Sequence, residues 1–81
     1  MNNSVRATLE AGMVYRLHGE KSQFECLHQL YGSFYSPQHT YRLFNVKSGW
    51  SFIAHGVNMY EDGSIDWDFS TDGYFAERMG I

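Results

Sequence analysis

The residues best suited to chemistry in this 81-residue chain are one cysteine, four histidines and nine carboxylates. Cys26 and His28 are two positions apart, so on a β-strand they would share a face, and His18, His39 or His55 could add a ligand. Zinc sites usually combine two closely spaced ligand pairs, and this sequence has one. We therefore expect no bound metal. A small zinc-binding protein that uses Cys26, His28 and another histidine is the alternative function.

Asp66 and Asp68 are spaced like a carboxylate pair that could act as general acid and base. They belong to the alternating segment 64–70, where they share the polar face with Ser64 and Ser70, and solvated carboxylates are expected there. No nucleophile has an activating motif, and no glycine-rich phosphate-binding loop occurs. The expectation is a protein that is not an enzyme, with no catalytic residues and no cofactor.

Charge is distributed unevenly along the chain, although the formal net charge is only −3. No lysine or arginine occurs from Ser48 to Glu77, and that stretch holds six of the nine carboxylates. Phosphate contacts need clustered cations, so no direct nucleic-acid binding is expected. An acidic face could instead occupy the cationic channel of a nucleic-acid-binding enzyme. The candidate partner-binding carboxylates are Glu61, Asp62, Asp66, Asp68 and Asp72.

Aromatic residues make up 17% of the chain, and three of them lie in or beside a predicted loop over residues 31–38, which contains the only proline. A small barrel has little core left to cover Tyr31, Phe34 and Tyr35. Surface aromatic side chains are typical anchors for a protein partner. We expect Phe34 to plug one end of the barrel, and we take Tyr31 and Tyr35 as candidate partner-binding residues.

Period-two alternation of apolar and polar residues predicts that β-strands position these side chains. Three strands are expected over residues 40–46, 50–60 and 64–70. Glycine-containing turns separate them, so they should form an antiparallel meander of consecutive hairpins. Gly56, inside the second segment, marks a bulge or a bend.

The segment 64–70 alternates most regularly. Trp67 and Phe69 should point into the core, whereas Asp66 and Asp68 should point to solvent. A register slip of one residue would exchange the two faces, so these four assignments stand or fall together.

Two more strands are expected over residues 13–18 and 23–31. Residues 5–10 could form a short strand or a single helical turn, and the tail after Asp72 could form one helical turn. Five strands in so short a chain predict one all-β domain over residues 1–81. Its expected architecture is a five-stranded antiparallel meander or barrel of SH3-like or OB-like size.

A single cysteine excludes a disulfide within the chain and favours a reducing compartment. The first residues contain no apolar signal-peptide core, and no apolar stretch is long enough to span a membrane. The expectation is a cytoplasmic protein without a membrane partner.

The segment GWSFIAHG over residues 49–56, followed by YEDGSIDWDF over residues 60–69, resembles small accessory proteins of bacterial phages and conjugative elements. Anti-CRISPR inhibitors, which are short, acidic, single-domain and non-catalytic, are among these proteins. The resemblance covers the central third of the chain and includes no defining motif, so no functional residue is transferred. It implies a non-catalytic protein-binding module, an inhibitor. The acidic face and the loop aromatics, which the residues themselves indicate, are the surfaces expected to dock on its protein partner.

Overall fold

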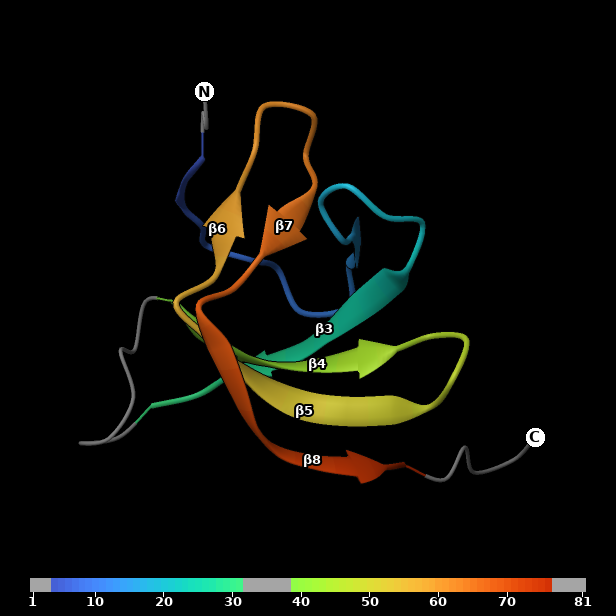
Figure 1. Ribbon diagram of the computed structural model, residues 1–81. Coiled ribbons are helices and arrows are strands. Elements are labelled where there is room, and N and C mark those ends of the chain that lie inside the picture. Colours follow the sequence, from blue (N-terminus) through green and yellow to red (C-terminus); the bar gives the residue numbers. More distant parts are fainter. Residues whose placement is uncertain (1–3, 32–38, 77–81) are drawn as a thin grey trace.

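The computed structural model describes residues 4–31 and 39–76, and all strand pairs within these ranges are antiparallel. A five-stranded sheet has the order β2-β3-β4-β5-β8, and a three-stranded sheet has the order β1-β6-β7 (Figure 1). The described ranges contain no helix, and the expected all-β antiparallel class is confirmed. The strands are β1 (Val5–Arg6), β2 (Val14–Arg16), β3 (Gln23–Gln29), β4 (Thr40–Asn45), β5 (Trp50–His55), β6 (Asn58–Met59), β7 (Ile65–Asp66) and β8 (Phe69–Phe75).

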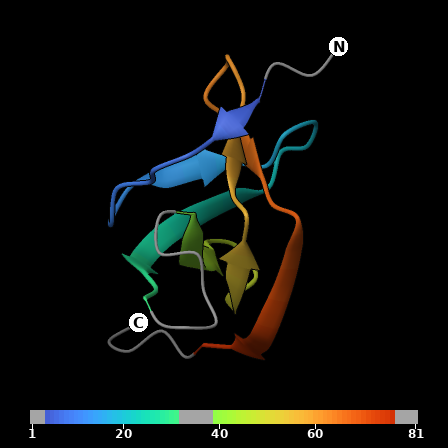
Figure 2. The same ribbon diagram turned by 90° about the vertical axis from the view of Figure 1, so that its left-hand side faces the viewer.

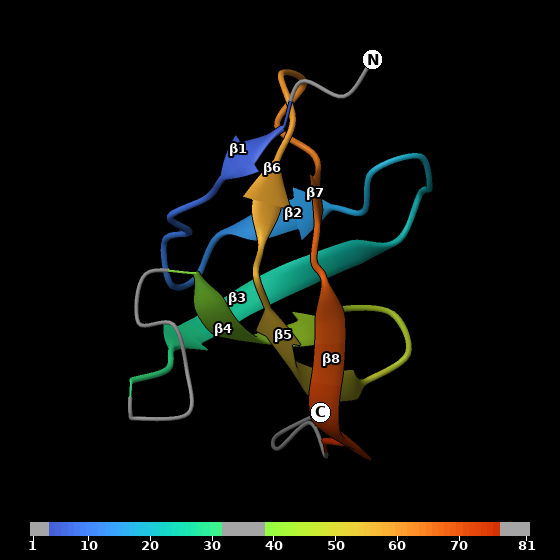
Figure 3. The same ribbon diagram turned by 60° about the vertical axis from the view of Figure 1, so that its left-hand side comes forward.

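Four of these strands belong to one long, bent hairpin. β6 pairs with β7 through Met59 and Ile65, and β5 pairs with β8 in the same register through His55 and Phe69. Because the register is unchanged across the break, β5 continues into β6 and β7 continues into β8, as Figure 3 shows. Gly56, at φ 71°, lies at the bend, which directs the upper half of the hairpin into the second sheet.

The expected strands over residues 50–60 and 64–70 are therefore each interrupted once, and the interruption changes which side chains are buried. Trp67 packs against the core as expected, although it is half-buried and not fully buried, and Phe69 is 58% exposed. The prediction for Phe69 was wrong because residues 67–68 belong to neither strand, so alternation does not continue from β7 into β8. Asp68 is exposed as predicted, whereas Asp66 is half-buried.

The two ends of the described chain are extended. Residues 5–10 contain the short strand β1, which lies beside β6 (Figure 2). The helical turn expected after Asp72 is wrong for residues 73–75, because β8 continues there and pairs Phe75 with Trp50. Asp72, at φ 54°, begins a bulge that places Asp72 and Gly73 opposite Phe52.

The end of β2 approaches the upper hairpin, so the two sheets enclose one core. Leu17 forms an isolated parallel bridge with Ile65, and the His18 N–H donates to the Ile65 carbonyl over 2.8 Å. This contact covers part of the β2 edge, which the five-stranded sheet would otherwise leave open.

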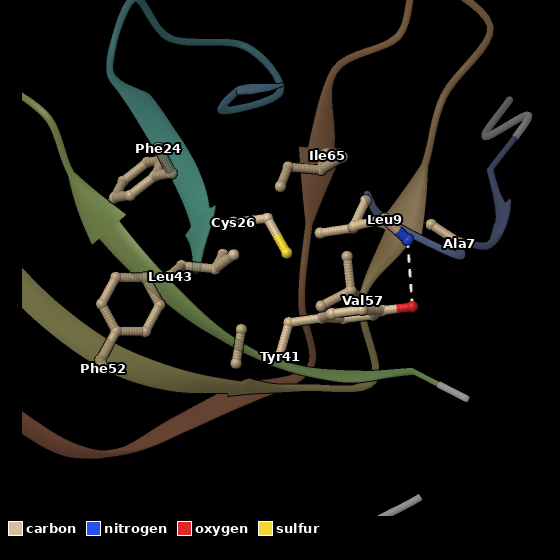
Figure 4. Close-up of a cluster of buried hydrophobic side chains, with 10 residues drawn as sticks. Ala7, Leu9, Phe24, Cys26, Tyr41, Leu43, Phe52, Val57 and Ile65 are labelled. Atoms are coloured by element: carbon tan, nitrogen blue, oxygen red, sulfur yellow. Dashed lines mark hydrogen bonds between the residues drawn. The ribbon is translucent and has the colours of Figure 1, made fainter. Parts of the chain in front are cut away.

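The core is formed by side chains from both sheets (Figure 4). The thiol of Cys26 lies at its centre, and the fully buried Tyr41 hydroxyl accepts a hydrogen bond from the Leu9 N–H over 3.0 Å. The buried members are Ala7, Leu9, Phe24, Cys26, Tyr41, Leu43, Phe52, Ala54, Val57 and Ile65. A buried tyrosine needs such a partner for its hydroxyl. A hydrogen bond as well as apolar packing therefore holds the loop after β1 against the core.

Trp67 completes an aromatic trio at one end of this core. Its ring centroid lies 5.3 Å from that of Phe24 and 5.1 Å from that of Phe52, and Phe24 meets Phe52 edge to face at 5.6 Å. Edge-to-face aromatic pairs contribute about 0.5–1.5 kcal/mol beyond the area that they bury. The tryptophan therefore fastens the bend of the hairpin to β3 and β5.

We expect Trp67→Ala to lower the free energy of unfolding by about 3 kcal/mol, because it removes a large side chain from the core and both aromatic contacts. A domain of this size has a total stability of only about 5 kcal/mol, so the variant should keep about 2 kcal/mol and unfold at a much lower urea concentration than the wild type. Urea denaturation followed by circular dichroism measures the loss. Phe75→Ala, which truncates a ring that is 69% exposed, is the matched control. Equal denaturation midpoints for the two variants would contradict the structural role of Trp67.

Candidate functional site

The predicted acidic residues lie at separate points along the bent hairpin. Glu61 and Asp62 lie in its tip, Asp66 in β7, Asp68 at the bend, and Asp72 in the bulge of β8. Whether a partner contacts these carboxylates stays a prediction, and their charge is partly balanced by groups of the same chain, as follows.

Asp62 accepts three hydrogen bonds from groups of the same chain. One carboxylate oxygen accepts hydrogen bonds from the Ser64 hydroxyl at 2.5 Å and the Ser64 N–H at 2.9 Å, and the other accepts one from Arg16 Nη2 at 2.8 Å. These Ser64 donors, with a smaller contribution from Arg16, lower the pKa of Asp62 to about 2. The carboxylate therefore closes the hairpin tip and joins it to β2.

Asp66 and Asp68 also have internal partners. Asp66 accepts hydrogen bonds from the Tyr60 hydroxyl at 2.6 Å and from Asn58 at 3.1 Å. The hydrogen bond to Asp66, together with desolvation, raises the pKa of Tyr60. Asp68 forms an ion pair with Arg6 over 3.1 Å. Three of the five predicted carboxylates are thus hydrogen-bonded or ion-paired within the molecule.

Ser64, His18 and Asp62 resemble a nucleophile, base and acid, but they are connected in a different order. The Ser64 hydroxyl donates its hydrogen to Asp62, so it accepts from His18 Nδ1 at 2.8 Å. A serine nucleophile needs the reverse arrangement, in which histidine takes the serine proton. Ser64 is also only 1% exposed, and His18 is stacked on Tyr60 at 3.5 Å. This cluster stabilises the hairpin tip.

Cys26 and His28 do not share a face, which corrects the premise of the zinc alternative. A bulge between them shifts the register, so Cys26 pairs with Leu43 and His28 pairs with Arg42. Leu43 and Arg42 are consecutive and point to opposite faces of β4, and the same holds for their partners. Burial and the charge of Glu25 raise the pKa of the Cys26 thiol to about 11. Across residues 4–31 and 39–76, no three His, Cys, Asp or Glu side chains are grouped to hold a metal.

Of the predicted loop aromatics, only Tyr31 falls within the described residues. Its side chain is 70% exposed, and its hydroxyl donates to Gln29 Oε1 over 2.7 Å. Phe34 and Tyr35 lie outside the described residues. The proposed binding role of the loop stays a prediction.

The structure reveals a second group of exposed rings that sequence reasoning missed: Trp50, Tyr74 and Phe75, here called the aromatic patch. Trp50 and Phe75 are directly opposite in the β5–β8 register, and their rings meet at 4.8 Å. Tyr74 pairs with Ser51 and points to the other face of the sheet, where the Arg42 guanidinium lies 5.1 Å from its ring. Adjacent aromatic residues in an extended tail were the available signal, and the expectation of a helical turn concealed it.

The bulge determines how this patch can be used. β8 is an edge strand that pairs only with β5 among the described strands, and such edges can add a strand from another chain. Asp72 and Gly73 interrupt the edge, however, and a Cβ on Gly73 would overlap the Trp50 indole. The edge is therefore irregular, and side chains rather than a continuous backbone ladder are available for recognition.

Compared with protein-family models, curated proteins and solved structures, the chain matches none of them. The parts of the chain that are described include no helix of the length and apolarity needed to cross a membrane.

Alkaline pH should destabilise the fold through Cys26. The thiol ionises near its ordinary pKa of 9.0 in the unfolded chain but near 11 in the folded one, so the unfolded state loses its proton first and stability falls between these values. Urea midpoints measured at pH 8 and pH 10.5 test this. Cys26→Ala should be less stable at pH 8 but show a smaller further loss. An equal loss in both proteins would contradict the assignment.

Acidic pH should destabilise the fold through Asp62, so this pH dependence runs in the opposite direction to that of Cys26. The pKa of Asp62 is lowered from 3.8 to about 2 in the folded chain, so its contribution is present above pH 4 and is lost as the pH falls toward 2. Urea midpoints of Asp62→Asn should therefore change less than those of the wild type across this window. Glu61→Gln, which removes one charge from the same turn, is the matched control, and an Asp62→Asn slope like the wild-type slope is the contrary result.

Proposed function

We propose that this protein is a non-catalytic protein-binding module that docks on its partner through the aromatic patch. The observation that carries the proposal is the exposure of Trp50 and Phe75, at 38% and 69%, whose rings meet at one end of β5 and β8. Tyr74, 50% exposed, extends the aromatic surface to the other face of the same strand end. Tryptophan and tyrosine are prominent among the residues that dominate binding energy at protein interfaces. A partner that covers these rings removes a large apolar area from water.

Two rings of the patch are packed against the protein and against each other without a partner. The Trp50 indole is packed against Gly73 and meets Phe75 at an interplanar angle of 69°. Side chains that are fixed in advance lose less conformational entropy on binding, so more of the contact energy contributes to affinity. This favours a recognition role over a set of freely rotating surface rings.

A partner surface with apolar and basic side chains suits this region best. Tyr74 already accommodates the guanidinium of Arg42 on its ring, which demonstrates the chemistry within the chain. The exposed carboxylates of Glu61 and Asp72 and the net charge of −3 favour a cationic partner, chiefly by speeding association. A nucleic-acid-binding enzyme offers such a surface.

The proposal includes a cytoplasmic location, because the single cysteine is a buried free thiol. It also includes inhibition of the partner, which the resemblance to phage and conjugative-element accessory proteins of the anti-CRISPR type implies. Binding and inhibition are separable, so the experiment below measures binding first.

Affinity capture from a bacterial lysate, quantified by mass spectrometry, tests the proposal. Four forms of the protein are compared: wild type, Phe75→Ser, Tyr31→Ser and Val14→Ser. Truncating a central aromatic anchor should weaken binding about 30-fold, so a protein retained by the wild type should be lost with Phe75→Ser. Val14→Ser, an exposed apolar position on β2, is the matched surface control and should leave retention unchanged.

The loop hypothesis predicts the opposite pattern. If Tyr31→Ser abolishes retention while Phe75→Ser does not, the loop aromatics carry the binding and the aromatic patch does not. Retention that is equal in all four forms would also contradict the proposal. Circular dichroism of each variant confirms that the exposed substitutions leave the fold intact.

A further inference from the structure

A hollow of about 280 Å³ lies at the bend of the hairpin, at the opposite end of β8 from the aromatic patch. It opens to solvent where β1, the start of β4, the end of β5 and the start of β8 meet. The residues that line it are Arg6, His39, Thr40, His55, Gly56, Asp68 and Phe69.

The charged groups of the hollow neutralise each other but remain accessible. Arg6 Nη2 and Asp68 Oδ2 are 3.1 Å apart, and the two side chains are 49% and 50% exposed. Arg6 Nη1 also donates to the Gly56 carbonyl over 2.8 Å, which fixes the plane of the guanidinium. The pair thus presents hydrogen-bond donors and acceptors side by side, in a fixed arrangement, with no net charge.

His39 is held in one orientation by the backbone. Its Nδ1 lies 3.2 Å from the Ala7 carbonyl oxygen, which can only accept, so the proton of the neutral ring is on Nδ1. In that tautomer Nε2 is an acceptor. His39, which also lines the hollow, thus has a ring nitrogen that can accept a hydrogen bond.

Phe69 supplies an apolar wall. One face of its ring is stacked on His55, with centroids 4.5 Å apart and planes 8° apart. His55 is itself hydrogen-bonded through Nε2 to the Thr71 hydroxyl over 2.7 Å, which supports the stack from behind. The ring is still 58% exposed, so its other face is accessible to a ligand.

We propose that this hollow binds a neutral sugar unit. A sugar has a C–H face that packs on an aromatic ring and hydroxyl groups that each donate and accept, which matches Phe69 beside the Arg6–Asp68 pair. A phosphate or a carboxylate fits less well, because Asp68 already neutralises Arg6. The volume suits one sugar ring, being at the small end of ligand pockets.

This site is independent of the aromatic patch, and its test does not require a protein partner. The ¹⁵N-labelled protein is titrated with the methyl glycosides of glucose, galactose, mannose and N-acetylglucosamine, and separately with inorganic phosphate. Heteronuclear NMR spectra are recorded at each step. At least one glycoside should shift the amide signals of Gly56, Asp68 and Phe69 in a saturable way. The expected dissociation constant is about millimolar, as for a small ligand in an open site.

Phe69→Ala should weaken binding of that glycoside about tenfold, because the stacking wall is lost. Asp68→Asn, which keeps the shape but removes the charge-assisted acceptor, should weaken it to a similar degree. Val14→Ala, on the opposite edge strand, should leave the affinity unchanged, and well-dispersed spectra establish that each variant is folded. The proposal is overturned if none of the four glycosides gives saturable shifts, if phosphate alone perturbs these amides, or if Phe69→Ala binds like the wild type.

Discussion

The conformation of Gly56 is the constraint on which most of this structure depends. Its φ of 71° lies in the left-handed region, and a Cβ at this position would overlap the Asp68 carboxylate and the Arg6 guanidinium. Only glycine meets both conditions without strain. Because the chain can turn here without losing register, one hairpin contributes strands to two sheets, and the core forms between them. The same turn draws Trp67 inward and leaves Phe69 at the surface.

Polar groups at the upper half of the hairpin serve mainly to hold this bent geometry. Arg6 fastens β1 across the bend, Asp62 joins the hairpin tip to β2, and Asp66 receives the Tyr60 hydroxyl. Individually, exposed ion pairs contribute little, typically 0–1 kcal/mol. Together they help to hold the two short strands β6 and β7 in place, since strands of two residues bury too little to do so alone.

The class of the fold could be read from the sequence, because alternation and turn residues are local signals. The segments 40–46 and 23–31 contain β4 and β3, and the turn at Asp62-Gly63 forms the expected hairpin tip. The burial of Phe69 could not be read, because it depends on where the chain passes from one sheet to the other. The bulge that separates Cys26 from His28 was equally hidden, since nothing in the local composition distinguishes a regular strand there from a bulged one.

The bulge in β8 links the stability of the molecule to the recognition surface that we propose. A regular seven-residue edge strand with exposed aromatic residues would invite unspecific pairing with other chains, and natural proteins interrupt such edges. Asp72 and Gly73 do so here, at the position where Trp50 needs a residue without a side chain beneath its indole. One irregularity therefore discourages strand addition and at the same time seats the largest ring of the patch. The partner that we propose would then be recognised by the shape and chemistry of the rings, which is a more selective requirement than an open row of backbone groups.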